Sequence, residues 1–145
     1  MPAPYDLQRF IDAQASQYRA ALEELRMGEK RSHWIWFIFP QLRGLGSSRN
    51  AELYGIASLA EARAYLAHPI LGDRLRECVR AVLQVGGASA EQILGSIDAM
   101  KFRSCLTLFQ KADPDEPLFS RALQRFFGAT GDSATLELLN QQPDP

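Results

Sequence analysis

Residues 32–40 read SHWIWFIFP, and the six residues from Trp34 to Phe39 form the longest wholly apolar run of the chain. Aromatic and β-branched residues favour a buried strand. However, the sequence holds no second run of comparable strength that could pair with such a strand, and a lone buried strand leaves its backbone groups unpaired. We therefore predict a short buried helix here, with Ser32 as its N-cap.

The segments on either side of this run have clearer patterns. Before it, apolar residues at steps of three and four predict one amphipathic helix from an N-cap at Asp6 to a stop at Gly28. They are Leu7, Phe10, Ile11, Tyr18, Leu22 and Leu25. After it, residues 41–50 read QLRGLGSSRN, and their Gly and Ser content indicates a loop.

The rest of the chain predicts helices separated by caps and breakers. Ser58 caps 59–67, with Glu61 completing a capping box; 70–85 starts after Pro69; Ser89 caps 90–94; Ser96 precedes 97–111; 115–127 ends at Gly128; and Ser133 caps 134–140. The predicted fold class is all-α: a compact single-domain array of about seven helices over residues 1–145, with 141–145 as a frayed tail.

Length and composition exclude several classes of protein. A chain of 145 residues with 46% hydrophobic residues has room for one domain and its own core, which excludes disorder. Six apolar residues in a row fall far short of the roughly 20 that span a membrane. A net charge of −1 argues against a nucleic-acid partner. Because the N-terminus has no basic and apolar signal pattern, we expect a cytoplasmic protein.

Cysteine and histidine are too few for a metal centre or a disulfide framework. Cys78 and Cys105 lie far apart and flank no motif, so we expect small core residues inside helices. His33 and His68 are the only histidines, and no Asp or Glu stands at a convincing ligand spacing from them. His68 precedes Pro69, which favours a role in a turn. We predict no metal and no cofactor.

The segment from Arg26 to Arg49 is locally basic, with five basic residues and one acidic residue. Two of its glycines, Gly44 and Gly46, could let backbone N–H groups face an anion. The dinucleotide fingerprint needs a third glycine at 49, where Arg49 stands, and no GK[ST] sequence follows. A simple turn and a solvated loop whose cations pair with helix carboxylates are therefore the favoured alternatives to an anion site.

Asp98 and Lys101 lie three residues apart on a predicted helix, where an ordinary ion pair is the simpler interpretation. His33 follows two cations and precedes the aromatic run, so it could act as an acid, a base or a ligand donor, or only satisfy backbone groups at a helix start. The four aromatic residues between Trp34 and Phe39 are interpreted as core rather than as a stacking surface.

The string from Arg31 to Ser48 resembles the signature of a bacterial family of unknown function that is numbered 1810. Further matches include Tyr54-Gly55-Ile56, His68-Pro69 and Asp98 with Lys101, Ser104 and Thr107, while Phe102 and Cys105 depart from the usual pattern. The resemblance covers nearly the whole chain and implies a compact, all-α, cytosolic bacterial domain. It implies no activity. Members are sometimes labelled calpastatin, but the inhibitor of that name is disordered and repeat-bearing, unlike this globular sequence.

Three functional hypotheses follow, the least favoured of which is a nucleic-acid binder that uses the basic segment from Arg26 to Arg49. The first is a pocket for a small anionic metabolite or nucleotide-like ligand, with or without catalysis, between the Ser32–Ser48 segment and the Asp98–Lys101 helix. Its candidate residues are His33, Gln41, Arg43, Gly44, Gly46, Ser48, Asp98 and Lys101. Buried polar groups cost free energy unless they are paired, and packing alone needs none of these side chains. The second is a helical protein–protein interaction module without catalytic activity.

Overall fold

The computed structural model describes residues 5–142, which form ten helices. Their bounds are α1 Gln8–Gln14, α2 Tyr18–Met27, α3 Ile35–Ile38, α4 Arg49–Leu53, α5 Leu59–Ala67, α6 Leu71–Leu83, α7 Ala90–Leu94, α8 Ser96–Ala112, α9 Pro117–Phe127 and α10 Ser133–Gln141. The all-α prediction is confirmed for this part of the chain, but the expected number of about seven helices is wrong.

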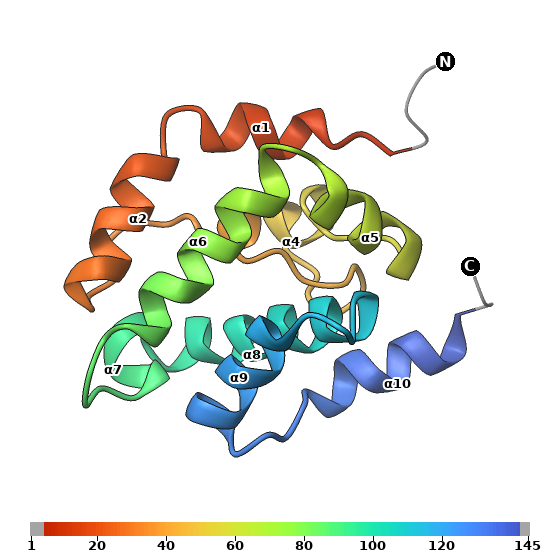
Figure 1. Ribbon diagram of the computed structural model, residues 1–145. Coiled ribbons are helices and arrows are strands. Elements are labelled where there is room, and N and C mark those ends of the chain that lie inside the picture. Colours follow the sequence, from red (N-terminus) through yellow and green to blue (C-terminus); the bar gives the residue numbers. More distant parts are fainter. Residues whose placement is uncertain (1–4, 143–145) are drawn as a thin grey trace.

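Helix α8 is the centre of the array (Figure 1). It packs against α3, α5, α7, α9 and α10, and α6 packs against α2, α5 and α9 on the other side. One core holds the molecule together, and its largest fully buried side chains include Trp34, Tyr65, Phe10, Phe39 and Phe102. Because α8 contacts most of the other helices, several segments of the chain come together at the surface beside its N-terminal half.

The apolar run does form a helix, but one of only four residues, Ile35–Ile38. Ser32 is not its N-cap. The residue before the helix is Trp34, which makes no side-chain cap bond, and the Ser32 hydroxyl instead donates to Glu24 Oε2 at 2.8 Å. The Glu24 carboxylate of α2 thus holds the Ser32 hydroxyl, and Ser32 lies two residues too early in the chain to cap α3.

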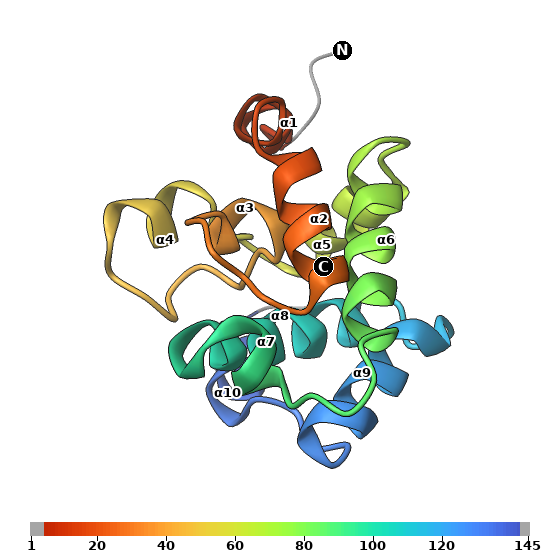
Figure 2. The same cartoon turned by 90° about the vertical axis from the view of Figure 1, so that its left-hand side faces the viewer.

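The first predicted helix is in fact two helices. Chain direction changes at residues 15–17, so that Figure 2 shows α1 end-on with α2 descending from it. Gln14, the last residue of α1, is buried, and its amide donates to the Phe37 carbonyl at 2.7 Å. No proline or glycine marks this corner; a tertiary hydrogen bond fixes it. Gly28 ends α2 in a left-handed conformation, as predicted.

The predicted loop at 41–50 includes the start of a helix that the sequence analysis missed. Ser48 caps α4 by accepting from the Ala51 N–H, at 3.1 Å. Before it, Leu42 pairs with Ile56 in an isolated parallel bridge. The segment between α3 and α4 therefore extends to one side of the helical body and is held at its base (Figure 2).

Most other boundaries lie within a few residues of prediction. Ser58 and Ser89 are confirmed as N-caps. Three details were wrong: Leu7, not Asp6, stands at the N-cap position of α1 and makes no side-chain cap bond, Asp132, not Ser133, caps α10, and Glu61 does not complete a capping box. The Glu61 carboxylate instead accepts from the Ala57 N–H and binds Arg9 at 3.0 Å. The predicted frayed tail includes Gln141, which ends α10, and Gln142, whose amide donates to the Ala57 carbonyl. Residues 143–145 of that tail lie outside the described part.

Both cysteines are free and buried, as expected. Burial raises the pKa of the Cys78 thiol to about 12, and it raises that of Cys105 as well. His68 has the predicted turn role, because its Nδ1 accepts from the N–H groups of Ile70 and Leu71 at the start of α6. None of the helices described between residues 5 and 142 is long and apolar enough to cross a membrane.

Candidate functional site

A cleft of about 470 Å³ opens where the segment before α3 faces the α7–α8 corner, and we call it the charged cleft. Its titratable side chains are Lys30, His33, Asp98 and Lys101, and the remaining lining residues are Ile35, Trp36 and Leu94–Ile97. Small-molecule sites commonly have volumes of about 300–1,000 Å³. The cleft therefore has room for a ligand of metabolite size.

The backbone of residues 31–34 is held in place by the Glu24 carboxylate. Its Oε1 accepts from the N–H groups of Arg31 and Ser32, at 2.7 and 2.9 Å, and from the Trp34 indole at 3.1 Å. Burial raises the pKa of Glu24, but these hydrogen bonds together outweigh it, so that the pKa is lowered overall. A charged acceptor thus fixes the wall that carries His33.

Lys30 is anchored to the opposite wall. Its N–H donates to the Ile93 carbonyl in α7 at 2.8 Å, and its ammonium lies 2.8 Å from Asp98 and 4.8 Å from the centre of the Trp34 ring. The side chain is only 7% exposed. Lys30 is therefore both a structural link between the two walls and the innermost positive charge of the cleft.

Asp98 is shared by two ammonium groups. Lys101 lies 3.9 Å from it, one turn further along α8, and 5.2 Å from the centre of the Trp36 ring. Among the described residues that line the charged cleft, Asp98 is the one acid beside two lysines. The cleft is therefore left with a net positive charge before His33 is counted.

Helix α8 adds to this potential. Gly95 takes φ +88° between α7 and α8, so that α8 begins directly at the cleft. The first N–H groups of a helix have no acceptor within it, and the helix dipole places partial positive charge at that end. Both features favour a negative group beside Ser96 and Ile97.

A second cleft, of about 530 Å³, lies on the other side of Lys101, and we call it the polar cleft. Its lining residues are Gln41, Leu45, Gly46, Ser47, Ser48, Ala51, Ile97, Met100, Lys101, Ser104, Asp132 and Ala134. Ile97 and Lys101 line both clefts. The two clefts therefore adjoin along one face of α8.

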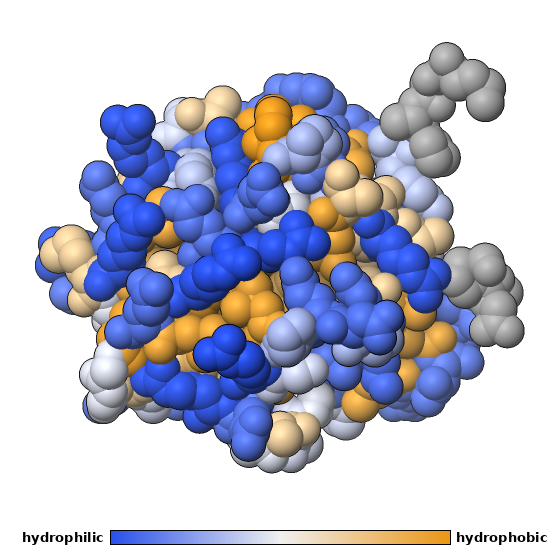
Figure 3. Space-filling view, in the orientation of Figure 1, coloured by the Kyte–Doolittle hydropathy of each residue, from blue (hydrophilic) through white to orange (hydrophobic). Residues whose placement is uncertain are grey.

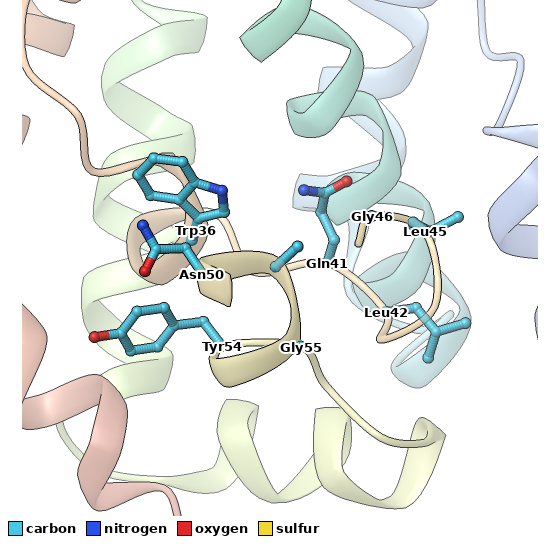
Figure 4. Close-up of a pocket in the computed structure, with 9 residues that line it drawn as sticks. Trp36, Gln41, Leu42, Leu45, Gly46, Asn50, Tyr54 and Gly55 are labelled. Carbon is cyan, nitrogen blue, oxygen red and sulfur yellow. The ribbon is translucent and has the colours of Figure 1, made fainter. Parts of the chain in front are cut away.

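Figure 4 shows the joint between α3, α4 and residues 41–46. The Trp36 ring and the Gln41 amide extend in the same direction from it, the ring beside Asn50 and the amide beside Gly46. The recess between these segments holds only about 10 Å³, roughly the space of one water molecule. This joint is a packing contact that orients Trp36 and Gln41 toward the larger clefts.

The predicted site residues divide into three groups. His33, Asp98 and Lys101 meet in the charged cleft, while Gln41, Gly46 and Ser48 meet Lys101 in the polar cleft. Arg43 and Gly44 line neither cleft. The Arg43 guanidinium donates to the Gly55 carbonyl at 2.9 Å, and Gly44, at φ +107°, faces Leu138.

The glycines are explained by local geometry. Gly44 has a positive φ that other residues rarely adopt, and a Cβ at Gly46 would lie 2.9 Å from the Cβ of Ala51. The basic segment is also largely paired, since Arg26 binds Glu77 and Arg31 binds Glu29, at 3.2 Å each. These contacts agree with the simpler alternatives that the sequence left open for both features.

Three contributors were missed by sequence reasoning. Lys30 was counted in the basic segment but was not assigned to the site. Trp36 was interpreted as core, whereas it is half-buried and lines the charged cleft. Asp132 comes from the start of α10, about thirty residues beyond Lys101, and no local signal connects it with the site.

The described residues contain no group of three His, Cys, Asp or Glu side chains that could hold a metal ion. The clefts instead offer ammonium, imidazole, amide and hydroxyl groups. Such groups recognise anions and hydrogen-bonding ligands.

The arrangement defines a class: an all-helical domain with two adjoining clefts on its central helix. The chain belongs to the family described as "Protein of unknown function (DUF1810)", whose model matches residues 4–139. The resemblance predicted from the sequence is thus confirmed. That description assigns no activity, so the chemistry of the site has to be argued from its geometry.

The fold is also found in a crystal structure at 1.38 Å of the conserved hypothetical protein Rv1873 from Mycobacterium tuberculosis. That protein is similar to this chain at 51% sequence identity and a TM-score of 0.94, and the match covers 97% of this chain and 100% of Rv1873. A comparison with curated proteins gives no match.

Proposed function

We propose that this domain binds a small anionic metabolite in the charged cleft. The observation that carries the proposal is the sharing of one carboxylate, Asp98, by the ammonium groups of Lys30 and Lys101. The Lys30 ammonium forms a close ion pair with Asp98, at 2.8 Å, whereas the Lys101 ammonium is 3.9 Å from Asp98 and its side chain is 29% exposed. Lys101 therefore has hydrogen-bond capacity left for a ligand.

The surroundings of Lys101 favour an anion over other ligands. Its ammonium lies against the Trp36 ring, which is a less polar neighbour than water and strengthens electrostatic interactions there. His33 and the start of α8 offer further donors around the same space. A phosphate or carboxylate in the cleft would neutralise the excess charge of the two lysines.

The proposal is tested by titrating the ¹⁵N-labelled protein with sodium phosphate, and with sodium chloride at matched ionic strength. We expect saturable NMR shifts at residues 30–33 and 96–101 with phosphate alone. Lys101→Gln removes a charge-assisted hydrogen bond and should weaken phosphate binding about tenfold.

Arg31→Gln is the matched control, because it also removes one positive charge, at a residue next to Lys30 in the chain that does not line the cleft. Phosphate affinity should be unchanged in this variant. Equal weakening by both substitutions would show a general effect of net charge, and an absence of saturable shifts would contradict the proposal directly.

One observation favours the alternative, an interaction module. Ile97 and Met100 are 73% and 67% exposed, three residues apart on α8. The other exposed large apolar residues described, Met27, Leu53 and Ile70, belong to separate elements. Figure 3 shows another face as mainly hydrophilic, with an apolar area, crossed by hydrophilic side chains, near the end of α6. Light scattering tests this alternative. It is supported if the protein self-associates and if the double substitution Ile97→Ser with Met100→Ser abolishes that association.

A further inference from the structure

The polar cleft differs from the charged cleft in electrostatics although they share Lys101 and Ile97. Among its described lining residues, the charged side chains are one lysine, Lys101, and one acid, Asp132. The other polar groups are uncharged amides and hydroxyls. This cleft has no excess positive charge to attract a second anion. Its uncharged polar groups suit a neutral ligand group that forms hydrogen bonds.

The hydrogen-bond capacity left in the polar cleft can be read from the contacts already made. The Ser48 hydroxyl accepts from Ala51, which leaves its proton to donate. The Ser104 hydroxyl donates to the Met100 carbonyl, at 3.1 Å, which leaves its lone pairs to accept. Asp132 uses Oδ2 for the N–H and hydroxyl of Thr135, and Oδ1 is left as an acceptor.

Gln41 completes this set. Its backbone carbonyl accepts from the Ile56 N–H at 2.8 Å, so its position is fixed by the chain. Its amide extends from the joint in the same direction as the Trp36 ring (Figure 4), and it supplies both a donor and an acceptor. The cleft thus presents donors and acceptors together, beside the apolar surfaces of Leu45, Ile97 and Met100.

Mixed donors and acceptors beside apolar surface suit a sugar, because its hydroxyls both donate and accept while its C–H face is apolar. Resting on the proposed function, we infer that the ligand has two parts: a phosphate in the charged cleft and an uncharged, hydroxyl-bearing sugar in the polar cleft. The shared chemistry is a sugar phosphate ester, whether free or as part of a nucleoside monophosphate. Lys101, which borders both clefts, lies where the phosphate joins the sugar.

The test compares four probes on the full chain by NMR or calorimetric titration: sodium phosphate, ribose, ribose 5-phosphate and AMP. We expect ribose 5-phosphate to bind at least tenfold more tightly than phosphate, because each added hydrogen bond is worth about two- to tenfold in affinity. Tighter binding of AMP than of ribose 5-phosphate would assign the ligand to the nucleotides. Equal binding would assign it to the sugar phosphates.

Gln41→Ala should remove about two- to tenfold of the affinity for ribose 5-phosphate and leave that for phosphate unchanged. The control is Gln110→Ala, since Gln110 has the same side chain but lies on α8 and lines a different cleft. A thermal melt of each variant verifies folding before titration.

Equal affinities for phosphate and ribose 5-phosphate would overturn the inference and leave the proposed function intact. The same holds if Gln41→Ala weakens both probes equally. If none of the three phosphate-containing probes binds, the inference and the proposed function are both overturned. The same holds if ribose is the one probe of the four that binds.

Discussion

Trp34 and Trp36 lie two residues apart, and each has a lysine ammonium over its ring, yet their surroundings are opposite. Trp34 is fully buried, and its indole donates to Glu24. Trp36 is half-buried and lines the charged cleft. Trp34 is the residue before α3 and Trp36 lies within it, so the turn of the chain into this helix sends one ring into the core and the other to the surface.

The same contrast extends to the two lysines. Lys30, over Trp34, is 7% exposed and lies close to Asp98, whereas Lys101, over Trp36, is 29% exposed and lies farther from it. In each pair, one side chain is buried within the fold, whereas the other is partly exposed at the charged cleft. The division follows from the depth at which each side chain lies and from the partners it already has.

The largest effect is expected from Trp34→Ala, which should lower the free energy of unfolding by about 3–5 kcal/mol through lost packing and the cavity left behind. Trp36→Ala should cost only about 1–2 kcal/mol, because less of its ring leaves water on folding. Urea denaturation at pH 7 measures both. Equal losses would mean that Trp36 is a core residue and does not form a wall of the charged cleft.

An intermediate effect is expected from Glu24→Gln, about 1 kcal/mol at pH 7. The pKa of Glu24 is lowered below its usual value of 4.5, so the stability it provides is present above pH 4.5 and is lost as the pH falls through the lower, folded-state pKa. The difference between the parent and the variant should therefore shrink in acid, as measured by urea denaturation at several pH values. The neighbouring and exposed Glu23 offers the control Glu23→Gln, and a similar pH profile for both variants would contradict the role of Glu24.

Local signals in the sequence predicted what local contacts decide. The caps at Ser58 and Ser89 and the stop at Gly28 depend on groups within a few residues, and all three were found. The corner between α1 and α2 depends on Gln14 reaching Phe37, twenty-three residues away. Such a bond leaves no pattern in the nearby sequence, so one continuous helix was predicted.

The site shows the same limit. The sequence indicated where cations and glycines gather, but not which of them already had partners. Arg43 donates to the Gly55 carbonyl, and Gly44 has the positive φ of a turn. Lys30, in the same basic segment, lines the cleft because its backbone N–H is bound to α7. Asp132 could not be assigned to the polar cleft from the sequence, because it lies far from Lys101 along the chain.

The smallest effect on stability is expected from Lys101→Ala, at most about 0.5 kcal/mol, because a partly exposed ion pair at 3.9 Å contributes little. Lys30→Ala should cost more, about 2 kcal/mol, since it leaves the Asp98 carboxylate without its 2.8 Å partner in a poorly hydrated place. Thermal and urea unfolding of both variants gives this difference directly. If Lys101→Ala destabilises as much as Lys30→Ala, both ammonium groups are held by Asp98 for folding, and Lys101 is not free to bind an anion. A near-neutral Lys101→Ala would instead show that this ammonium is held beside Trp36 without contributing to folding, which is the condition that binding of an anion requires.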